Sequence, residues 1–192
     1  MLFPVELYTD GSSLRNPGAS GLAYIIRYWV DPNNTGTPES QQIEFSQAYR
    51  LSTNNRMEIL AVITGLKDVL SKVRASTIQT NQINIFTDSE YVSNAINQNW
   101  LSKWQSNNWM TSGYRDRSPS AVKNKDLWEQ VLNIQGELKN EGINFTISHV
   151  QGHADNQFNN RADELAQAAS NSGENSLIDE TYEEIYVSNH AR

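Results

Sequence analysis

The chain has 192 residues with 22 acidic and 15 basic side chains, for a formal net charge of -7, and 38% of its residues are hydrophobic. This length suits one compact domain, and the composition is that of a folded chain. The absence of cysteine excludes disulfides and thiolate metal sites, and the absence of an apolar run of about 18 residues excludes a membrane span. Taken alone, the acidic balance also argues against a polyanionic partner. We expect a cytoplasmic monomer without a signal peptide, since no basic segment followed by an apolar one opens the chain.

The first half of the chain predicts three strands followed by a helix. Apolar and β-prone residues indicate strands over residues 4–9, 21–30 and 43–51, and their short linkers favour antiparallel pairing. Residues 31–42 are rich in Pro, Gly, Asn and Thr and predict a long turn. Apolar residues then recur at helical spacing from Met57 to Leu70, which predicts an amphipathic helix.

The second half predicts alternating strands and helices. We expect a strand at 83–87, a helix from about Ser89, a helix at 126–138, a strand at 143–150 and a helix at 160–169. Together these elements predict an α/β fold with a mixed five-stranded sheet and helices packed on it.

Residues 171–192 form an acidic segment, with five acidic residues and one basic residue. We interpret them as a tail that is largely exposed, with a short ordered piece at residues 182–187, attached to a domain of residues 1–170. Three alternatives stay open for this tail: a disordered solubility element, a strand docked on the domain, and a peptide that binds a partner.

Four acidic residues fall where such a sheet brings them together. Asp10 is predicted to end the first strand and Asp88 the fourth, while Glu58 lies near the start of the first helix and Asp163 near the start of the helix at 160–169. Sites in open α/β sheets form at the carboxyl ends of the strands. Converging carboxylates repel one another unless cations bind them, and hard oxygen ligands suit Mg²⁺ or Mn²⁺.

Each of these acids also has a purely structural explanation. Asp10-Gly11 is common in turns, Glu58 and Asp88 lie near the caps of predicted helices, and Asp163 could complement a helix dipole. Structural caps have no reason to gather at one edge of one sheet, so the joint pattern favours a metal site.

Four motifs now point to a family. They are YTDGS with NPGASG (residues 8–21), TNNRME (53–58), FTDSEYV (86–92) and HVQGHAD followed by NRADELA (149–166). Over residues 3–170 their order and spacing resemble ribonuclease H type 1. The resemblance implies a ribonuclease H-like fold with strand order 3-2-1-4-5 and an endonuclease that hydrolyses the RNA strand of RNA–DNA hybrids.

The resemblance also implies a metal-dependent mechanism. The family uses two Mg²⁺ ions, with Mn²⁺ as an alternative, and its metal-binding carboxylates correspond to Asp10, Glu58, Asp88 and Asp163. His153 matches the mobile catalytic histidine of the family, whose pKa suits proton transfer.

Substrate contacts are implied in two regions. Asn16, Asn54 and Asn55 correspond to residues that lie in the minor groove of the hybrid, where the 2′-hydroxyls mark the RNA strand. Glu90 replaces the glutamine of the family, so it can accept a hydrogen bond from a 2′-hydroxyl but cannot donate one.

The second region is residues 99–126, which hold five basic and two acidic residues and resemble the basic protrusion that grips the DNA strand. We expect Trp104, Trp109 and Lys123 to be its substrate contacts, although packing within the protrusion also explains the Trp residues. Residues 105–108, where relatives often carry a basic cluster, are uncharged.

Two other functions remain open. The same fold serves other metal-dependent nucleases and strand-transfer enzymes, and a catalytically inactive ribonuclease H-like module could bind nucleic acid without cleaving it. The presence of all four carboxylates and His153 favours an active enzyme. The acidic total does not exclude nucleic acid, because without these four carboxylates residues 1–170 hold 14 basic and 13 acidic residues. We expect the tail to oppose the attraction of a polyanion.

Overall fold

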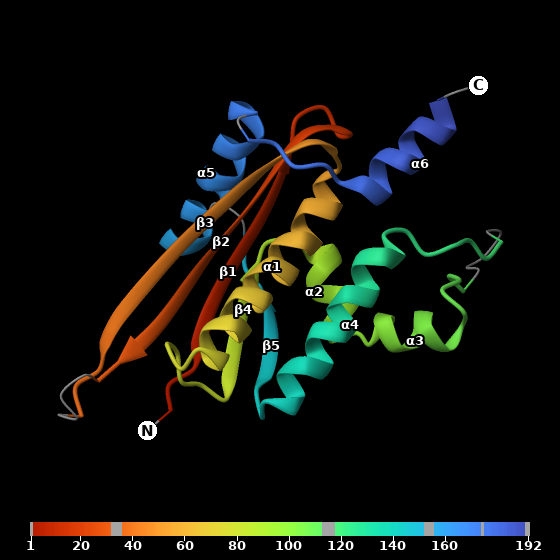
Figure 1. Ribbon diagram of the computed structural model, residues 1–192. Coiled ribbons are helices and arrows are strands. Elements are labelled where there is room, and N and C mark those ends of the chain that lie inside the picture. The colour runs from red at the N-terminus through yellow and green to blue at the C-terminus, as the bar shows by residue number, and fades with distance from the viewer. Residues whose placement is uncertain (1, 32–35, 113–117, 152–155, 174, 191–192) are drawn as a thin grey trace.

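The computed structural model describes residues 2–31, 36–112, 118–151, 156–173 and 175–190. Five strands and six helices follow one another along these residues (Figure 1). In chain order they are β1 (Val5–Ser13), β2 (Gly18–Val30), β3 (Glu39–Ser52), α1 (Asn54–Arg74), β4 (Gln82–Thr87), α2 (Glu90–Asn97), α3 (Trp100–Ser106), α4 (Lys125–Asn140), β5 (Asn144–His149), α5 (Gln157–Ser172) and α6 (Glu180–His190). None of these helices has the length and apolar character needed to cross a bilayer.

The strands form one mixed sheet in the order β3-β2-β1-β4-β5. β1 pairs antiparallel with β2 and parallel with β4, while β2 pairs antiparallel with β3 and β4 parallel with β5. The predicted fold class and strand order are therefore confirmed. The parallel pairs place the carboxyl ends of β1, β4 and β5 at one edge of the sheet.

β1 is longer than the sequence predicted. Asp10 does not end the strand, because antiparallel pairing with β2 continues through Gly11 opposite Leu22 as far as Ser13 opposite Ser20. Interpreting Asp10-Gly11 as a turn is therefore wrong. The parallel pairing with β4 does stop earlier, at Tyr8 opposite Phe86, so Asp10 lies just beyond it.

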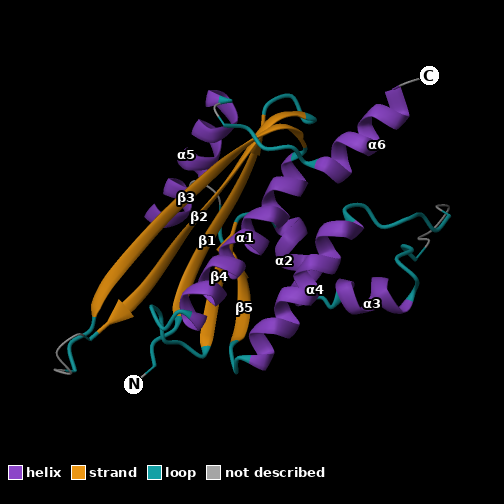
Figure 2. Ribbon diagram, in the orientation of Figure 1, coloured by secondary structure: helices purple, strands orange, loops and turns teal. Residues whose placement is uncertain are grey.

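Helices cover the two faces of the sheet unequally. α5 packs on one face, against β1 and β2, whereas α1, α2 and α4 lie on the other (Figure 2). The alternation of β1 explains how one strand serves both layers, since successive side chains point to opposite faces. Leu7 belongs to the large core under α1, and Tyr8 packs with Ala162 of α5.

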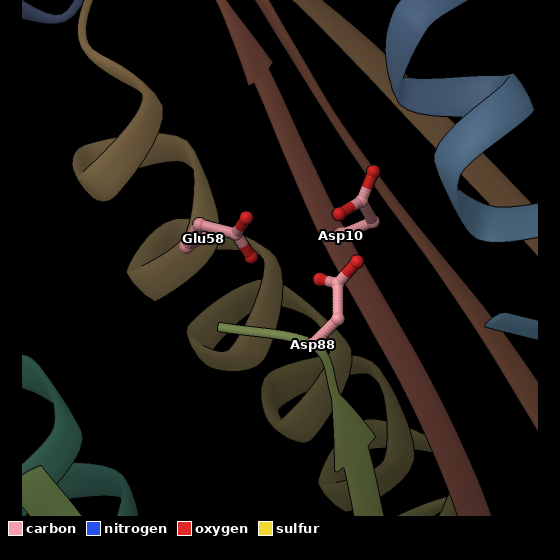
Figure 3. A group of neighbouring side chains, drawn as sticks. All are labelled: Asp10, Glu58 and Asp88. Atoms are coloured by element: carbon pink, nitrogen blue, oxygen red, sulfur yellow. The ribbon is translucent and has the colours of Figure 1, made fainter. Parts of the chain in front are cut away.

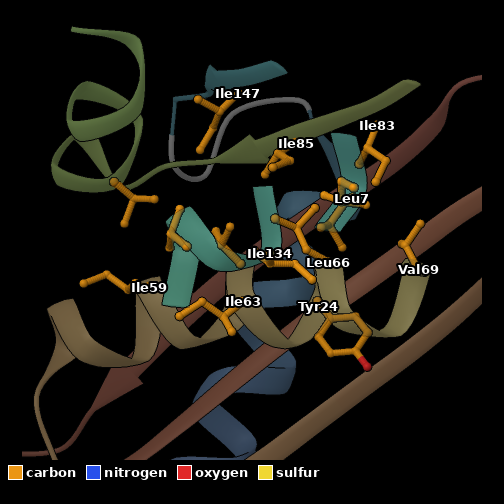
Figure 4. Packing of buried hydrophobic residues seen from close by; sticks show 14 of the residues in the cluster. Leu7, Tyr24, Ile59, Ile63, Leu66, Val69, Ile83, Ile85, Ile134 and Ile147 are labelled. Atoms are coloured by element: carbon orange, nitrogen blue, oxygen red, sulfur yellow. The ribbon is translucent and has the colours of Figure 1, made fainter. Parts of the chain in front are cut away.

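The large core lies between the sheet and helices α1 and α4 (Figure 4). Its strand residues include Ile83 and Ile85, and α1 contributes Leu66 at helical spacing. Trp128 of α4 is completely buried, and its indole N–H donates to the Tyr91 hydroxyl at 3.1 Å, so burial of its large ring leaves no unpaired donor.

Two glycines allow the helices to approach the sheet closely. A Cβ atom on Gly11 would lie 2.6 Å from the backbone carbonyl carbon of Met57 in α1. A Cβ atom on Gly21 would lie 2.6 Å from the backbone nitrogen of Ser170 in α5. Since backbone atoms cannot move aside as side chains do, only glycine fits these positions.

The C-terminal tail is mostly exposed but docks on the domain at two points. The Leu177 carbonyl accepts from the Arg50 N–H at 3.0 Å and its own N–H donates to the Ala48 carbonyl at 2.8 Å, which extends the edge of β3. Asp179 is 6% exposed, whereas α6 has no buried residue. The ordered part of the tail is thus longer than the predicted 182–187, and the domain boundary at residue 170 stays a prediction, since α5 continues to Ser172.

Asp179 enters a buried ion-pair cluster around Arg56. Both Asp179 oxygens accept from the Arg56 guanidinium, at 2.6 and 2.8 Å, and Ser52 donates to Asp179 at 2.6 Å. Asp126 at the start of α4 accepts from the same guanidinium at 2.9 and 2.7 Å. One arginine of α1 therefore fixes both the tail and α4.

We expect Gly21→Ala to lower the free energy of unfolding by about 1–3 kcal/mol, because the added methyl group meets the backbone of α5. Gly136→Ala is the matched control, since it lies in α4 with open space around its Cβ position and should gain up to about 1 kcal/mol from helix propensity. Urea denaturation measures both. Equal stability of the two variants would contradict the close packing.

We expect Asp179→Ala to destabilise the protein by about 3 kcal/mol, because it removes one of the two carboxylates that compensate the buried Arg56. Exposed Glu184→Gln, on the same tail, should change the stability by less than about 0.5 kcal/mol. Thermal and urea unfolding of the full chain distinguish these results. If the two variants unfold alike, the tail does not stabilise the domain.

Candidate active site

Three carboxylates meet at the carboxyl edge of β1 and β4. Ligand oxygens of Asp10, Glu58 and Asp88 all lie within 4.8 Å of one another. Figure 3 shows them converging from three elements: Asp10 from β1, Glu58 from α1 and Asp88 from the end of β4. The structure thus brings together three of the four carboxylates that the sequence singled out.

The local fold explains each position. Asp88 follows the last residue of β4, and Ser89 caps α2 by accepting from the Val92 N–H. Thr53 caps α1 in the same way, by accepting from the Arg56 N–H, so that Glu58 lies one turn into the helix. The absent side chain of Gly11 then allows α1 to approach β1, which holds Glu58 beside Asp10.

Burial and mutual repulsion dominate the electrostatics of this cluster. Burial, followed by the charges of Asp88 and Asp163, raises the pKa of Asp10 to about 8. Burial, followed by the charges of Asp10 and Asp88, raises the pKa of Glu58 well above its ordinary value. Backbone hydrogen bonds from Gly11 lower both pKa values but only in part.

The donor set suits a hard divalent cation. Asp10 Oδ2 and Glu58 Oε2 are buried without a hydrogen-bond partner among the described residues. An ionised oxygen that is buried and unpaired is costly, and a cation removes this cost while it also relieves the repulsion. Carboxylate oxygens are the ligands that Mg²⁺ and Mn²⁺ prefer, so the residues present fit such an ion.

Asp163 lies beside the cluster. It is on α5, where Gln167 donates to its Oδ1 at 2.6 Å, and it is near enough to share a hydrogen bond with Asp10. α5 begins at Gln157, so Asp163 is in its second turn, later than the sequence predicted. The Asn156 side chain begins the helix by accepting from the Phe158 and Asn159 N–H groups at 3.2 Å.

His149 is a neighbour of the cluster that sequence reasoning did not single out. It ends β5, and its Nε2 lies 3.0 Å from the backbone carbonyl oxygen of Asp88. The parallel pairing of β4 and β5 places Thr87 opposite His149 and so causes this contact. The only sequence signal was its place at the start of the HVQGHAD motif.

The three predicted minor-groove asparagines lie together beside Glu58. The Asn16 side chain accepts from the Asn54 N–H at 3.1 Å, which joins the β1–β2 turn to the start of α1. The Asn54 amide lies 3.5 Å from Glu58 Oε1, and Asn55 is exposed. Glu90 is exposed at the start of α2, two residues after Asp88.

The predicted residues of the protrusion differ in their surroundings. Trp104 is half-buried and packs between Trp100 and Trp128, with ring centroids 5.8 and 5.9 Å apart, so it supports the hydrophobic core. Trp109 is half-buried beneath Lys125, whose ammonium nitrogen lies 5.9 Å from its ring centroid. Lys123 is exposed. His153 lies outside the described residues.

Fold and cluster together define a class: an α/β domain with buried carboxylates at the carboxyl edge of its central strands, built to hold hard divalent cations. Comparison with known proteins points to one family. A model described as RNase H matches residues 4–171. Ribonuclease H of Thermoanaerobacter sp. (strain X514) is 41% identical over 162 residues, which cover 84% of this chain and 86% of the relative. Ribonuclease H of Idiomarina loihiensis is 39% identical over 165 residues, or 86% of this chain and 87% of the relative.

Solved structures show the same fold. LC9-RNase H1, described as a type 1 RNase H with the type 2 active-site motif, aligns with a TM-score of 0.66 at 22% identity, covering 96% of this chain and 81% of its own. LC11-RNase H1 in complex with an RNA/DNA hybrid aligns with a TM-score of 0.57 at 22% identity, covering 88% of this chain and 97% of its own. The chain belongs to the ribonuclease H family, and the predictions of this family and of an enzyme are confirmed.

We expect Asp10→Asn to stabilise the metal-free protein above neutral pH. A carboxyl whose pKa rises from about 4 unfolded to about 8 folded binds its proton more tightly when folded, so its contribution to stability is lost as pH rises through this range. In EDTA the variant should unfold at least about 3 °C above the parent at pH 8, with a smaller gain at pH 5.

The control is Glu164→Gln, an exposed carboxylate on α5 that pairs with Arg161 at the surface. Its unfolding temperature should follow that of the parent at both pH values. Adding Mg²⁺ at pH 8 should stabilise the parent more than Asp10→Asn. A parent whose stability in EDTA does not fall between pH 5 and pH 8 contradicts the electrostatic strain at Asp10.

Proposed function

We propose that this protein is an endonuclease that hydrolyses the RNA strand of RNA–DNA hybrids with two bound divalent cations, Mg²⁺ or Mn²⁺. The observation that carries the proposal is the convergence of Asp10, Glu58 and Asp88 within 4.8 Å, with one oxygen each of Asp10 and Glu58 buried and without a hydrogen-bond partner in the described part of the chain. The family and the complex of LC11-RNase H1 with an RNA/DNA hybrid support the substrate class.

Asp10, Glu58, Asp88 and Asp163 would hold the cations. When bound, these ions lower the pKa of a water molecule and stabilise charge on the leaving oxygen. The fold contributes rigidity: Asp10 lies within a paired strand and Glu58 within a capped helix, so the ligand oxygens need little reorganisation. His153 is the proposed proton carrier.

The polar surface beside the cluster suits a minor groove. Asn16, Asn54 and Asn55 present amides that both donate and accept, as a 2′-hydroxyl requires. Their mutual contact, from the Asn54 N–H to Asn16, fixes this surface relative to Glu58. The Glu90 carboxylate can only accept a hydrogen bond. Lys123 is the proposed phosphate contact. Trp109 lies near Lys125 on the surface, whereas packing is the larger role of Trp104.

We expect Asp88→Asn to reduce cleavage of a labelled RNA–DNA hybrid in Mg²⁺ by roughly 1,000-fold or more, because the variant loses a ligand of ions that supply several kcal/mol of transition-state stabilisation. The substrates are the hybrid, double-stranded RNA and single-stranded DNA, each with Mg²⁺ and with EDTA. The parent should cleave only the RNA strand of the hybrid, and only with the metal.

Glu164→Gln again serves as the control, since it changes an acid of α5 outside the cluster and should cleave like the parent. Circular dichroism and thermal unfolding show whether Asp88→Asn keeps the fold. Substantial cleavage by a folded Asp88→Asn protein refutes the site. A parent that binds the hybrid without cleaving it supports the inactive binding module instead.

A further inference from the structure

A groove of about 840 Å³ runs between α6 and the start of α4. It adjoins the proposed minor-groove surface, because Asn16 and Asn55 are among the residues that line it. Figure 1 shows α6 projecting from the domain above the start of α4. The proposed substrate surface therefore continues into a space whose other wall is the C-terminal tail.

α6 turns chemically different faces to its two sides. Its groove side consists of Thr181, Tyr182, Ile185 and Asn189, without a carboxylate. The acids Glu180, Glu183 and Glu184 line a separate hollow on the other side, where Glu183 pairs with Arg50. Helical spacing separates the two sets. The tail is therefore acidic overall, but the face that it presents to the groove is uncharged.

Three rings follow one another along α6 as a ladder: Tyr182 lines the groove, and Tyr186 and His190 line the hollow next to it. The ring centroids of Tyr182 and Tyr186 are 6.2 Å apart, and those of Tyr186 and His190 are 4.2 Å apart and stacked. Tyr186 and His190 line a further hollow of about 450 Å³, which shares Tyr182, Ile185 and Asn189 with the groove. The rings therefore continue from the groove into this adjoining hollow.

The opposite wall carries two lysines. Lys123 and Lys125 line it, and Lys123 has no carboxylate partner among the described residues. The two acids on this wall are already engaged, Asp126 with Arg56 and Glu129 with Lys125 at 3.6 Å. Ammonium groups that share a groove with the Tyr182 ring, with two more rings in the adjoining hollow, suit a strand with phosphates along one side and unpaired bases along the other.

The ladder is held in place at its inner end. The Arg56 guanidinium lies 5.8 Å from the Tyr182 ring centroid, and the same guanidinium pairs with Asp179 immediately before α6. A rigid aromatic surface loses little conformational entropy when a ligand stacks on it. The anchoring of the tail thus also prepares this surface for binding.

We propose that α6 and the lysines opposite it bind a single-stranded nucleic-acid extension that continues from one strand of the hybrid. Rings stack on bases whatever their sequence, but the paired bases of a duplex do not present their faces to them. The enzyme should therefore prefer hybrids that adjoin an unpaired strand. This inference rests on the proposed function, because the extension is reached from the proposed hybrid site.

The experiment compares blunt hybrids with hybrids that carry an overhang of about ten nucleotides on either end of either strand. Binding is measured with the 192-residue Asp88→Asn protein, so that the substrate stays intact. We expect at least one overhang to tighten binding about tenfold, and Tyr186→Ala to reduce this gain to twofold or less. Tyr186→Phe, which keeps the ring, should retain the gain.

Val187→Ala is the matched control on α6, since Val187 is 62% exposed and lines the other hollow. It should keep the full overhang preference. Equal affinity for blunt and overhanging hybrids, or a preference that survives Tyr186→Ala, overturns the inference. So does a dimer in sedimentation that Tyr186→Ala dissociates, because a second copy then covers this face.

Failure of the two proposals can be told apart. If the parent does not cleave a blunt hybrid, the proposed function fails. If the parent cleaves it but shows no overhang preference, only the role of α6 fails. Thermal unfolding of Tyr186→Ala and Val187→Ala excludes a general loss of structure as the cause of a difference.

Discussion

Close contact between β1 and α1 is the constraint on which the site depends. A side chain at Gly11 would meet the backbone of α1, so its absence sets the distance between the strand that bears Asp10 and the helix that bears Glu58. That distance forces two carboxyl groups into a buried space and raises their pKa values. Hydrophobic burial under α1 and α4 stabilises the arrangement, as the large core around Leu66 and Trp128 shows. The fold therefore stores electrostatic repulsion that cation binding relieves.

Sequence patterns were sufficient for the sheet, because its strands are bounded by turn residues and its helices carry regular apolar stripes. They were insufficient wherever pairing between strands decides the outcome. Asp10-Gly11 has turn chemistry, yet β2 keeps both residues in the strand. Local periodicity also missed the short helix α3, whose seven residues include only one that is buried, Leu101.

The site shows the same division between local and long-range information. Motif spacing indicated the carboxylates, since each motif stands in the family's order along the chain. Asp179 belongs to no such motif. It lies in an acidic segment, so nothing in the sequence indicates that its side chain is buried. Its partner Arg56 lies 123 positions earlier, and only the folded chain joins them. The face of α6 that lacks acids could not be predicted for a similar reason, since the net charge of a segment does not show on which side of a helix its acidic residues lie.

The long separation between Arg56 and Asp179 has a consequence for the order in which the protein forms. A chain emerging from the ribosome makes α1 early, but the guanidinium that enters the buried cluster must wait for the tail to complete its pairing. Until then only Asp126 is available to it, from a helix that itself appears later than α1. The tail can therefore pair with Arg56 only after α1 and α4 have been synthesised, and this pairing acts directly on the helix that carries Glu58.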